Sequence, residues 1–205
     1  GYGIYPHRAR TPGFERDLLV HYLDSRDTAL YLADADGAFC RVEVPDSASK
    51  LVHREWLLIE LREPWTVGGA THPAGALLAA RLDDYLAGAR DLAVLFAPTD
   101  TTALSDITVT RHHVVLTVLD DVKSAIAVLT PGDDGWERRP LAGVPSLGTV
   151  EVGAVDDETS DALWVIATDF LTPPLSPLEL TLGFTLGAAT RGAVVGLVTA
   201  LCVLP

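Results

Sequence analysis

Arg111, His112 and His113 stand side by side and could carry chemistry, because a guanidinium binds carboxylates and an imidazole can bind a metal ion or move a proton. They directly precede the β-branched run that begins at Val114. Neighbouring side chains on a strand point to opposite faces, so the two imidazoles cannot easily share one metal ion. We predict a hydrogen-bonded strand start, and we keep open a second role in which the three residues line a channel and guide the anionic end of a peptide.

A nucleophilic serine would need a strained turn flanked by glycines, as in the pattern Gly-x-Ser-x-Gly. None of the eight serines has this setting. Ser146 comes closest, in the stretch Val-Pro-Ser-Leu-Gly, but the first glycine is missing. We therefore predict a turn serine at this position, and no catalytic residue among the 205.

The spacing of candidate ligands gives no support to a metal or phosphate site. No Cys-x-x-Cys or His-x-x-x-His pair occurs, and Gly68-Gly69 is not followed by the Lys-Ser/Thr of a phosphate loop. The acidic stretch from Asp156 to Asp161 lacks the alternating ligands, central glycine and closing glutamate of a calcium loop. It predicts a solvated turn, and we expect neither a metal nor a cofactor.

The charge balance excludes one class of partner. The chain carries 28 acidic residues against 15 Lys and Arg, a formal net charge of −13, and such a surface repels the phosphates of nucleic acids. Its two cysteines, Cys40 and Cys202, support no disulfide framework, so a reducing cytoplasmic setting is the default. No signal peptide is indicated, and the absence of Met leads us to expect an internal piece of a longer protein.

Turn residues bound a series of short apolar runs, which is the pattern of antiparallel strands. Residues 28–34 and 39–44 predict a hairpin closed by a tight Asp-Gly turn. Residues 64–75, rich in Gly and Pro, predict a loop or extended excursion, and residues 82–88 predict one or two helical turns that end at a glycine. Further strands are predicted at 77–80, 92–96, 107–110, 114–119, 125–129, 150–155 and 163–168. The chain is therefore predicted to be mainly β.

Three buried-looking runs recur at a spacing of about fifty residues: WLLIEL at 56–61, VVLTVL at 114–119 and LWVIAT at 163–168. The blades of a β-propeller require such a period with about four strands in each repeat, because each blade buries its faces only against its neighbours. We predict a β-propeller fragment of about four antiparallel four-stranded blades. The alternative is an ordinary β-sandwich, in which short strands recur without a long period.

The composition changes after residue 174. Residues 175–205 carry two charged side chains, Glu179 and Arg191, whereas charges are frequent in residues 1–174. Arg191 leaves too short an apolar run for a membrane helix. We expect a partial propeller over 1–174 and an anomalous apolar tail over 175–205. The tail is a buried strand pair, a helix on the open end of the propeller, or a segment that is non-native or frame-shifted.

Four segments of the sequence resemble one protein family: residues 53–88, 90–104, 110–131 and 161–174. They resemble the N-terminal β-propeller domain of bacterial prolyl oligopeptidase-type serine peptidases, and the resemblance spans residues 14–174. It implies a seven-bladed propeller that caps an α/β-hydrolase domain and admits short peptides, but not folded proteins, to the catalytic serine. The catalytic motifs of that family have no counterpart in this sequence.

The resemblance implies that these residues gate the entry of short peptides to a hydrolase domain that they do not contain. We therefore expect the isolated chain to be inactive, with that hydrolase domain and short peptides as its partners. We also expect self-association, because an open ring leaves blade faces exposed. The alternatives are a non-enzymatic propeller or sandwich that binds a protein or a peptide.

Overall fold

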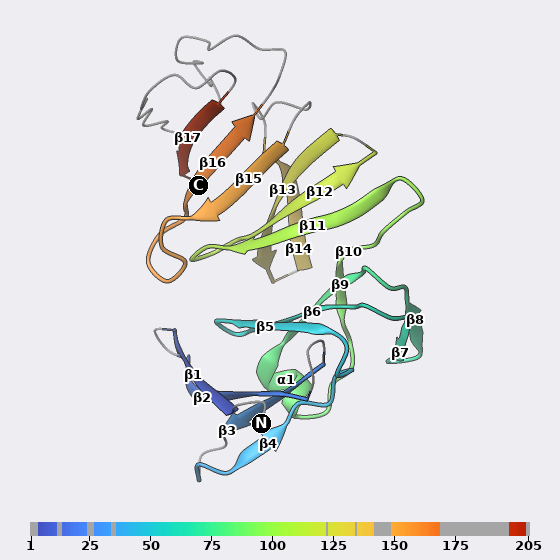
Figure 1. Cartoon of the computed structure of the whole chain (residues 1–205). Coiled ribbons are helices and arrows are strands. Elements are labelled where there is room, and N and C mark those ends of the chain that lie inside the picture. Colours follow the sequence, from blue (N-terminus) through green and yellow to red (C-terminus); the bar gives the residue numbers. More distant parts are fainter. Residues whose placement is uncertain are drawn as a thin grey trace. The chain divides into compact units, whose positions relative to one another are not determined.

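Antiparallel strands form nearly all the regular structure of the chain, which we describe from a computed structural model (Figure 1). The structure describes residues 4–11, 14–23, 27–33, 36–121, 123–133, 135–141, 149–168 and 197–203. The chain divides into two compact units, residues 1–98 and residues 99–205. Within the described ranges, no helix is long and apolar enough to cross a membrane.

The first unit contains two four-stranded antiparallel sheets. The first sheet has the order β1 (Ile4–Thr11), β2 (Phe14–Tyr22), β3 (Thr28–Ala33), β4 (Phe39–Arg41). The second has the order β10 (Ala93–Phe96), β9 (Leu77–Arg81), β6 (Trp56–Glu60), β5 (Ser49–His53). Between β6 and β9 the chain inserts a two-stranded hairpin, β7 (Trp65–Val67) and β8 (Ala70–His72), and after β9 it forms the short helix α1 (Leu82–Leu86).

The second unit contains two further antiparallel sheets. The third sheet has the order β11 (Thr102–Val109), β12 (Val114–Asp120), β13 (Lys123–Gly132), β14 (Gly135–Pro140). The fourth has the order β15 (Thr149–Ala154), β16 (Ala162–Thr168), β17 (Leu197–Val203). Strand β17 comes from the segment that the sequence set apart as a tail, and it pairs antiparallel with β16 along its whole length.

The prediction of a mainly β chain built from antiparallel sheets is confirmed. The three apolar runs that marked the repeat are β6, β12 and β16, and each is the second strand of its sheet in chain order. Each sheet is a meander whose strands follow one another in sequence, apart from the hairpin inserted in the second sheet. Successive sheets of this kind are consistent with a propeller-like fragment.

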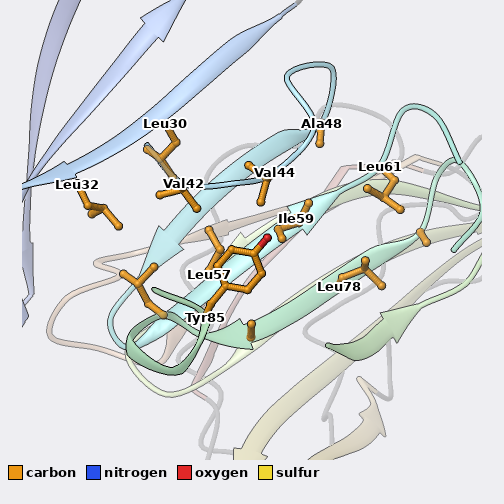
Figure 2. Packing of buried hydrophobic residues seen from close by; sticks show 13 residues of the cluster. Leu30, Leu32, Val42, Val44, Ala48, Leu57, Ile59, Leu61, Leu78 and Tyr85 are labelled. Atoms are coloured by element: carbon orange, nitrogen blue, oxygen red, sulfur yellow. The ribbon is translucent and has the colours of Figure 1, made fainter. Parts of the chain in front are cut away.

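The core of the first unit joins its two sheets and the helix α1. Figure 2 shows its side chains, which come from β3, β6 and β9, from the segment after β4, and from α1. Strand β6 is buried on both faces, since Leu57, Leu58 and Ile59 are each at most 1% exposed. A strand covered on both sides needs apolar residues at every position, which explains why its sequence is a continuous apolar run.

The core of the second unit lies between the third and fourth sheets. Its buried members are Val115, Ile126, Val128, Leu141, Val150, Val152, Leu163 and Val165. Along β16 the side chains alternate, because Leu163 and Val165 enter this core while Trp164 between them is 39% exposed. The third and fourth sheets therefore pack face to face through alternate residues.

The structure adds elements that the sequence analysis did not predict. Residues 64–75 contain the hairpin β7–β8, whose two-residue turn is Gly68-Gly69 with φ of +58° and +79°. Only glycine adopts such angles readily, and two of them in a row suit a tight hairpin turn. Strands β1, β2, β5 and β14 were also not predicted. Most residues of β14 are exposed, so it has no apolar alternation to reveal it.

Candidate functional site

Arg111 and His112 form the tip of the turn that joins β11 to β12. The turn is closed where the Thr110 amide donates a hydrogen bond of 2.9 Å to the His113 carbonyl. Strand β12 begins only at Val114, so the three predicted residues lie in the turn just before the strand. Arg111 and His112 are exposed and His113 is 5% exposed.

The carboxylate of Asp161, which lies just before β16 in the fourth sheet, binds this turn of the third sheet. Its Oδ1 accepts hydrogen bonds from the His112 amide at 2.7 Å and from the Thr110 hydroxyl at 2.9 Å. Its Oδ2 lies 2.7 Å from Nδ1 of His112. The Arg111 amide also donates to the Ser160 carbonyl at 3.1 Å. The turn is thus held to the fourth sheet by both side-chain and backbone hydrogen bonds.

The environment of Asp161 favours its ionised form. Its side chain is 14% exposed, and burial alone would raise the pKa of the carboxyl group. The hydrogen bonds from His112 and Thr110 outweigh burial, so the pKa of Asp161 lies below its usual value. This carboxylate therefore remains charged, and that charge strengthens the hydrogen bonds it accepts.

The two histidines have different partners. His113 is buried, and its Nδ1 lies 2.8 Å from the Thr130 hydroxyl of β13. His112 is half exposed and is engaged by Asp161. The two rings meet edge to face with centroids 6.5 Å apart. Across the part of the chain that the structure describes, no group of three or more His, Cys, Asp or Glu side chains could hold a metal ion.

The acidic stretch after β15 is a self-capped turn. Oδ1 of Asp156 accepts hydrogen bonds from the amides of Glu158 at 2.9 Å and Thr159 at 3.1 Å, and its carbonyl accepts one from the Ser160 amide at 3.2 Å. Hydrogen bonds from Thr159 and Glu158 hold the pKa of Asp156 below its usual value. A carboxylate already committed to turn amides is a structural group, as an Asx turn requires. Ser146 lies outside the described residues.

Lys50 is a second charged residue that joins two sheets, and the sequence analysis did not single it out. It lies on β5 of the second sheet, and its ammonium donates to the carbonyl of Thr28 at the start of β3 and, at 2.9 Å, to the carbonyl of Asp46. Burial lowers its pKa to about 8, although Asp46 and Asp27 act in the opposite direction. A lysine on a strand usually lies at the surface, so its sequence context gave no signal.

The fold and the contacts between sheets define a general class of protein. The chain is a β protein of successive antiparallel meander sheets, in which polar side chains link neighbouring sheets. Contacts of this kind fix the positions of sheets and turns.

Comparison with known proteins shows which proteins of this class the chain is similar to. The chain is 33% identical over 116 residues to "Uncharacterized peptidase y4nA" of Sinorhizobium fredii (strain NBRC 101917 / NGR234), a match of 55% of this chain and 16% of that protein. Its structure matches that of a post-proline cleaving enzyme from Rickettsia typhi with a TM-score of 0.70 and 18% identity, over 83% of this chain and 26% of that chain. No family model matches the sequence.

These two findings confirm the resemblance to prolyl oligopeptidase-type peptidases that the sequence indicated. The relative supplies a sequence likeness to a peptidase, and the solved structure supplies the fold. The match covers 16% of the first protein and 26% of the second, so the chain corresponds to a part of each.

Proposed function

We propose that this chain is the propeller portion of a prolyl oligopeptidase-like serine peptidase, and that it admits short peptides to a hydrolase domain while excluding folded proteins. The observation that carries this proposal is the structural match, which covers 83% of the chain but 26% of a post-proline cleaving enzyme. The likeness to a curated peptidase supports it independently. In this proposal the propeller part comprises residues 1–174 together with β17, which completes the fourth sheet.

The physical properties of the sheets suit a gate. A filter for peptide size must keep its shape while substrates pass, and a sheet buried on both faces cannot shift without exposing apolar surface. Strand β6 has this double burial, and the third and fourth sheets share a continuous core. In this proposal the turn with Arg111, His112 and His113 lies at the end of a strand that faces the passage, where the exposed guanidinium of Arg111 meets the carboxylate at the end of a peptide.

The proposal also covers the tail and the compartment. Of the three interpretations of residues 175–205, the pairing of β17 with β16 favours a strand that belongs to the fold. Cys40 is an exposed free thiol, which suits a reducing cytoplasmic compartment.

The proposal predicts that the purified 205-residue chain has no peptidase chemistry of its own. It should cleave no fluorogenic proline-containing peptide, and a fluorophosphonate probe should label none of its serines. The longer protein encoded by the same gene, assayed in parallel, should react with the probe at one serine outside this segment. Stoichiometric labelling of a serine within the segment would contradict the proposal.

A further inference from the structure

The contact between the third and fourth sheets has two layers with different physical properties. Beneath lies the apolar core, which resists separation but is not directional. At one end of the sheets lies a set of directional hydrogen bonds between the β11–β12 turn and the residues that lead into β16. Figure 1 shows the β11–β12 turn beside the loop that joins β15 to β16. Hydrogen bonds are directional whereas apolar packing is not, so the polar layer adds a fixed register to a contact that the core already holds together.

Asp161 is at the centre of the polar layer. Its carboxylate receives the amide and ring of His112 and the hydroxyl of Thr110, which is 0% exposed. These partners are 49 to 51 residues away in sequence, so the contacts connect separate sheets. Farther along the same boundary, the Thr108 hydroxyl donates to the Val152 carbonyl at 3.1 Å. Asp161 thus gathers several inter-sheet hydrogen bonds on one side chain.

We propose that Asp161 is the positioning residue that latches the β11–β12 turn to the fourth sheet, so that the third and fourth sheets act as one rigid element with Arg111 and His112 held at a fixed place on it. The latch itself is a property of this chain. A role of the latch in selecting the peptides that pass rests on the proposed function. The latch itself can be measured by amide exchange, without an assay of activity.

The test is amide hydrogen exchange of the 205-residue chain, with the Asp161→Ala variant compared with the unmodified chain. Removing the carboxylate deletes the acceptor of the His112 amide, so we expect exchange at His112 and Arg111 to accelerate by about tenfold or more. Exchange at Val115 within β12 should not change. Asp157→Ala is the matched control, because it removes an exposed carboxylate from the same loop and should leave all these rates unchanged.

Three further variants provide the test if Asp161→Ala does not fold. Thr110→Val and His112→Ala each remove one donor from the carboxylate, and each should accelerate exchange at the turn relative to the unmodified chain, by less than the roughly tenfold expected when the whole carboxylate is removed. Asp161→Asn keeps the shape and an acceptor, so it should restore part of the protection. Unchanged exchange at Arg111 and His112 in the folded variants would overturn the latch. A failure of the gating proposal would leave these rates as predicted and would be seen only in substrate selectivity.

Discussion

Asp161 and Lys50 are charged side chains that the fold withdraws from water at the boundary between two sheets. Withdrawal is costly for a charge unless hydrogen bonds replace those of water. Asp161 receives three such bonds, whereas the Lys50 ammonium donates to two backbone carbonyls and, at 3.3 Å, to the Thr28 hydroxyl. The pKa of both residues is lowered, with opposite consequences for their charge. A lowered pKa favours the charged form of Asp161 and the neutral form of Lys50.

The lowered pKa of Asp161 predicts an acid-sensitive contribution to stability. Because the folded carboxyl has a pKa below that of the unfolded chain, its contribution is present above the ordinary aspartate pKa of about 4 and is lost as the pH falls through the folded value. The urea midpoint of the unmodified chain should therefore fall more steeply below about pH 4 than that of Asp161→Asn. Parallel pH profiles for the two proteins would contradict this assignment, and Asp157→Asn is the control.

The lowered pKa of Lys50 predicts a rise in stability at alkaline pH. Between about 8 and the ordinary value of 10.5 the unfolded chain binds more protons than the folded one, so this residue makes stability increase with pH. Lys50→Met should abolish that increase, and urea unfolding at a series of pH values between roughly 8 and roughly 10 measures it. Lys123→Met, at an exposed position, should leave the profile unchanged.

At the scale of elements, the sequence predicted those strands and the helix whose positions are set by a pattern of apolar residues. Strands β6, β12 and β16 and the helix α1, which ends before Gly88 at φ of +102°, all follow from buried runs and a glycine stop. Strand β14 and the hairpin β7–β8 are largely exposed and are held by backbone pairing. Backbone pairing does not depend on an apolar pattern, so the amino-acid composition of these segments did not reveal them. The Asp161 contacts were missed for a different reason, since their partners are about fifty residues away and no local spacing encodes them.

The hairpin β7–β8 offers a direct test of element packing. Gly68 has φ of +58°, and a Cβ added there would clash with the Arg90 carbonyl oxygen. Gly69 has φ of +79° with nothing within 4 Å of the added Cβ. Gly69→Ala should cost about 1 kcal/mol from backbone strain alone, and Gly68→Ala about 2–4 kcal/mol because the steric clash adds to it. Thermal unfolding of both variants measures the difference, and equal losses would show that the hairpin does not pack against Arg90.

At the scale of the whole molecule, each sheet depends on its neighbours for burial. The two units have separate cores, one of which joins the first and second sheets and the other the third and fourth. Sheets that bury each other within a unit are stable only while their apolar faces are covered. Under the proposed function, the rest of a longer peptidase would supply that cover, and these sheets would limit what reaches its hydrolase domain.

The most direct test of the proposed gate is the ratio of kcat/KM for a short and a long peptide with the same proline-containing cleavage site, measured on the proposed longer peptidase that would contain this segment. A size-selective gate predicts strong preference for the short peptide. Leu163→Ala, which opens a cavity between the third and fourth sheets at a side chain that is 0% exposed, should weaken this preference. Leu119→Ala, at a side chain that is 40% exposed, is the control and should leave the ratio unchanged. Equal kcat/KM for both peptides, or a ratio unaffected by Leu163→Ala, would contradict the claim that this segment is the gate.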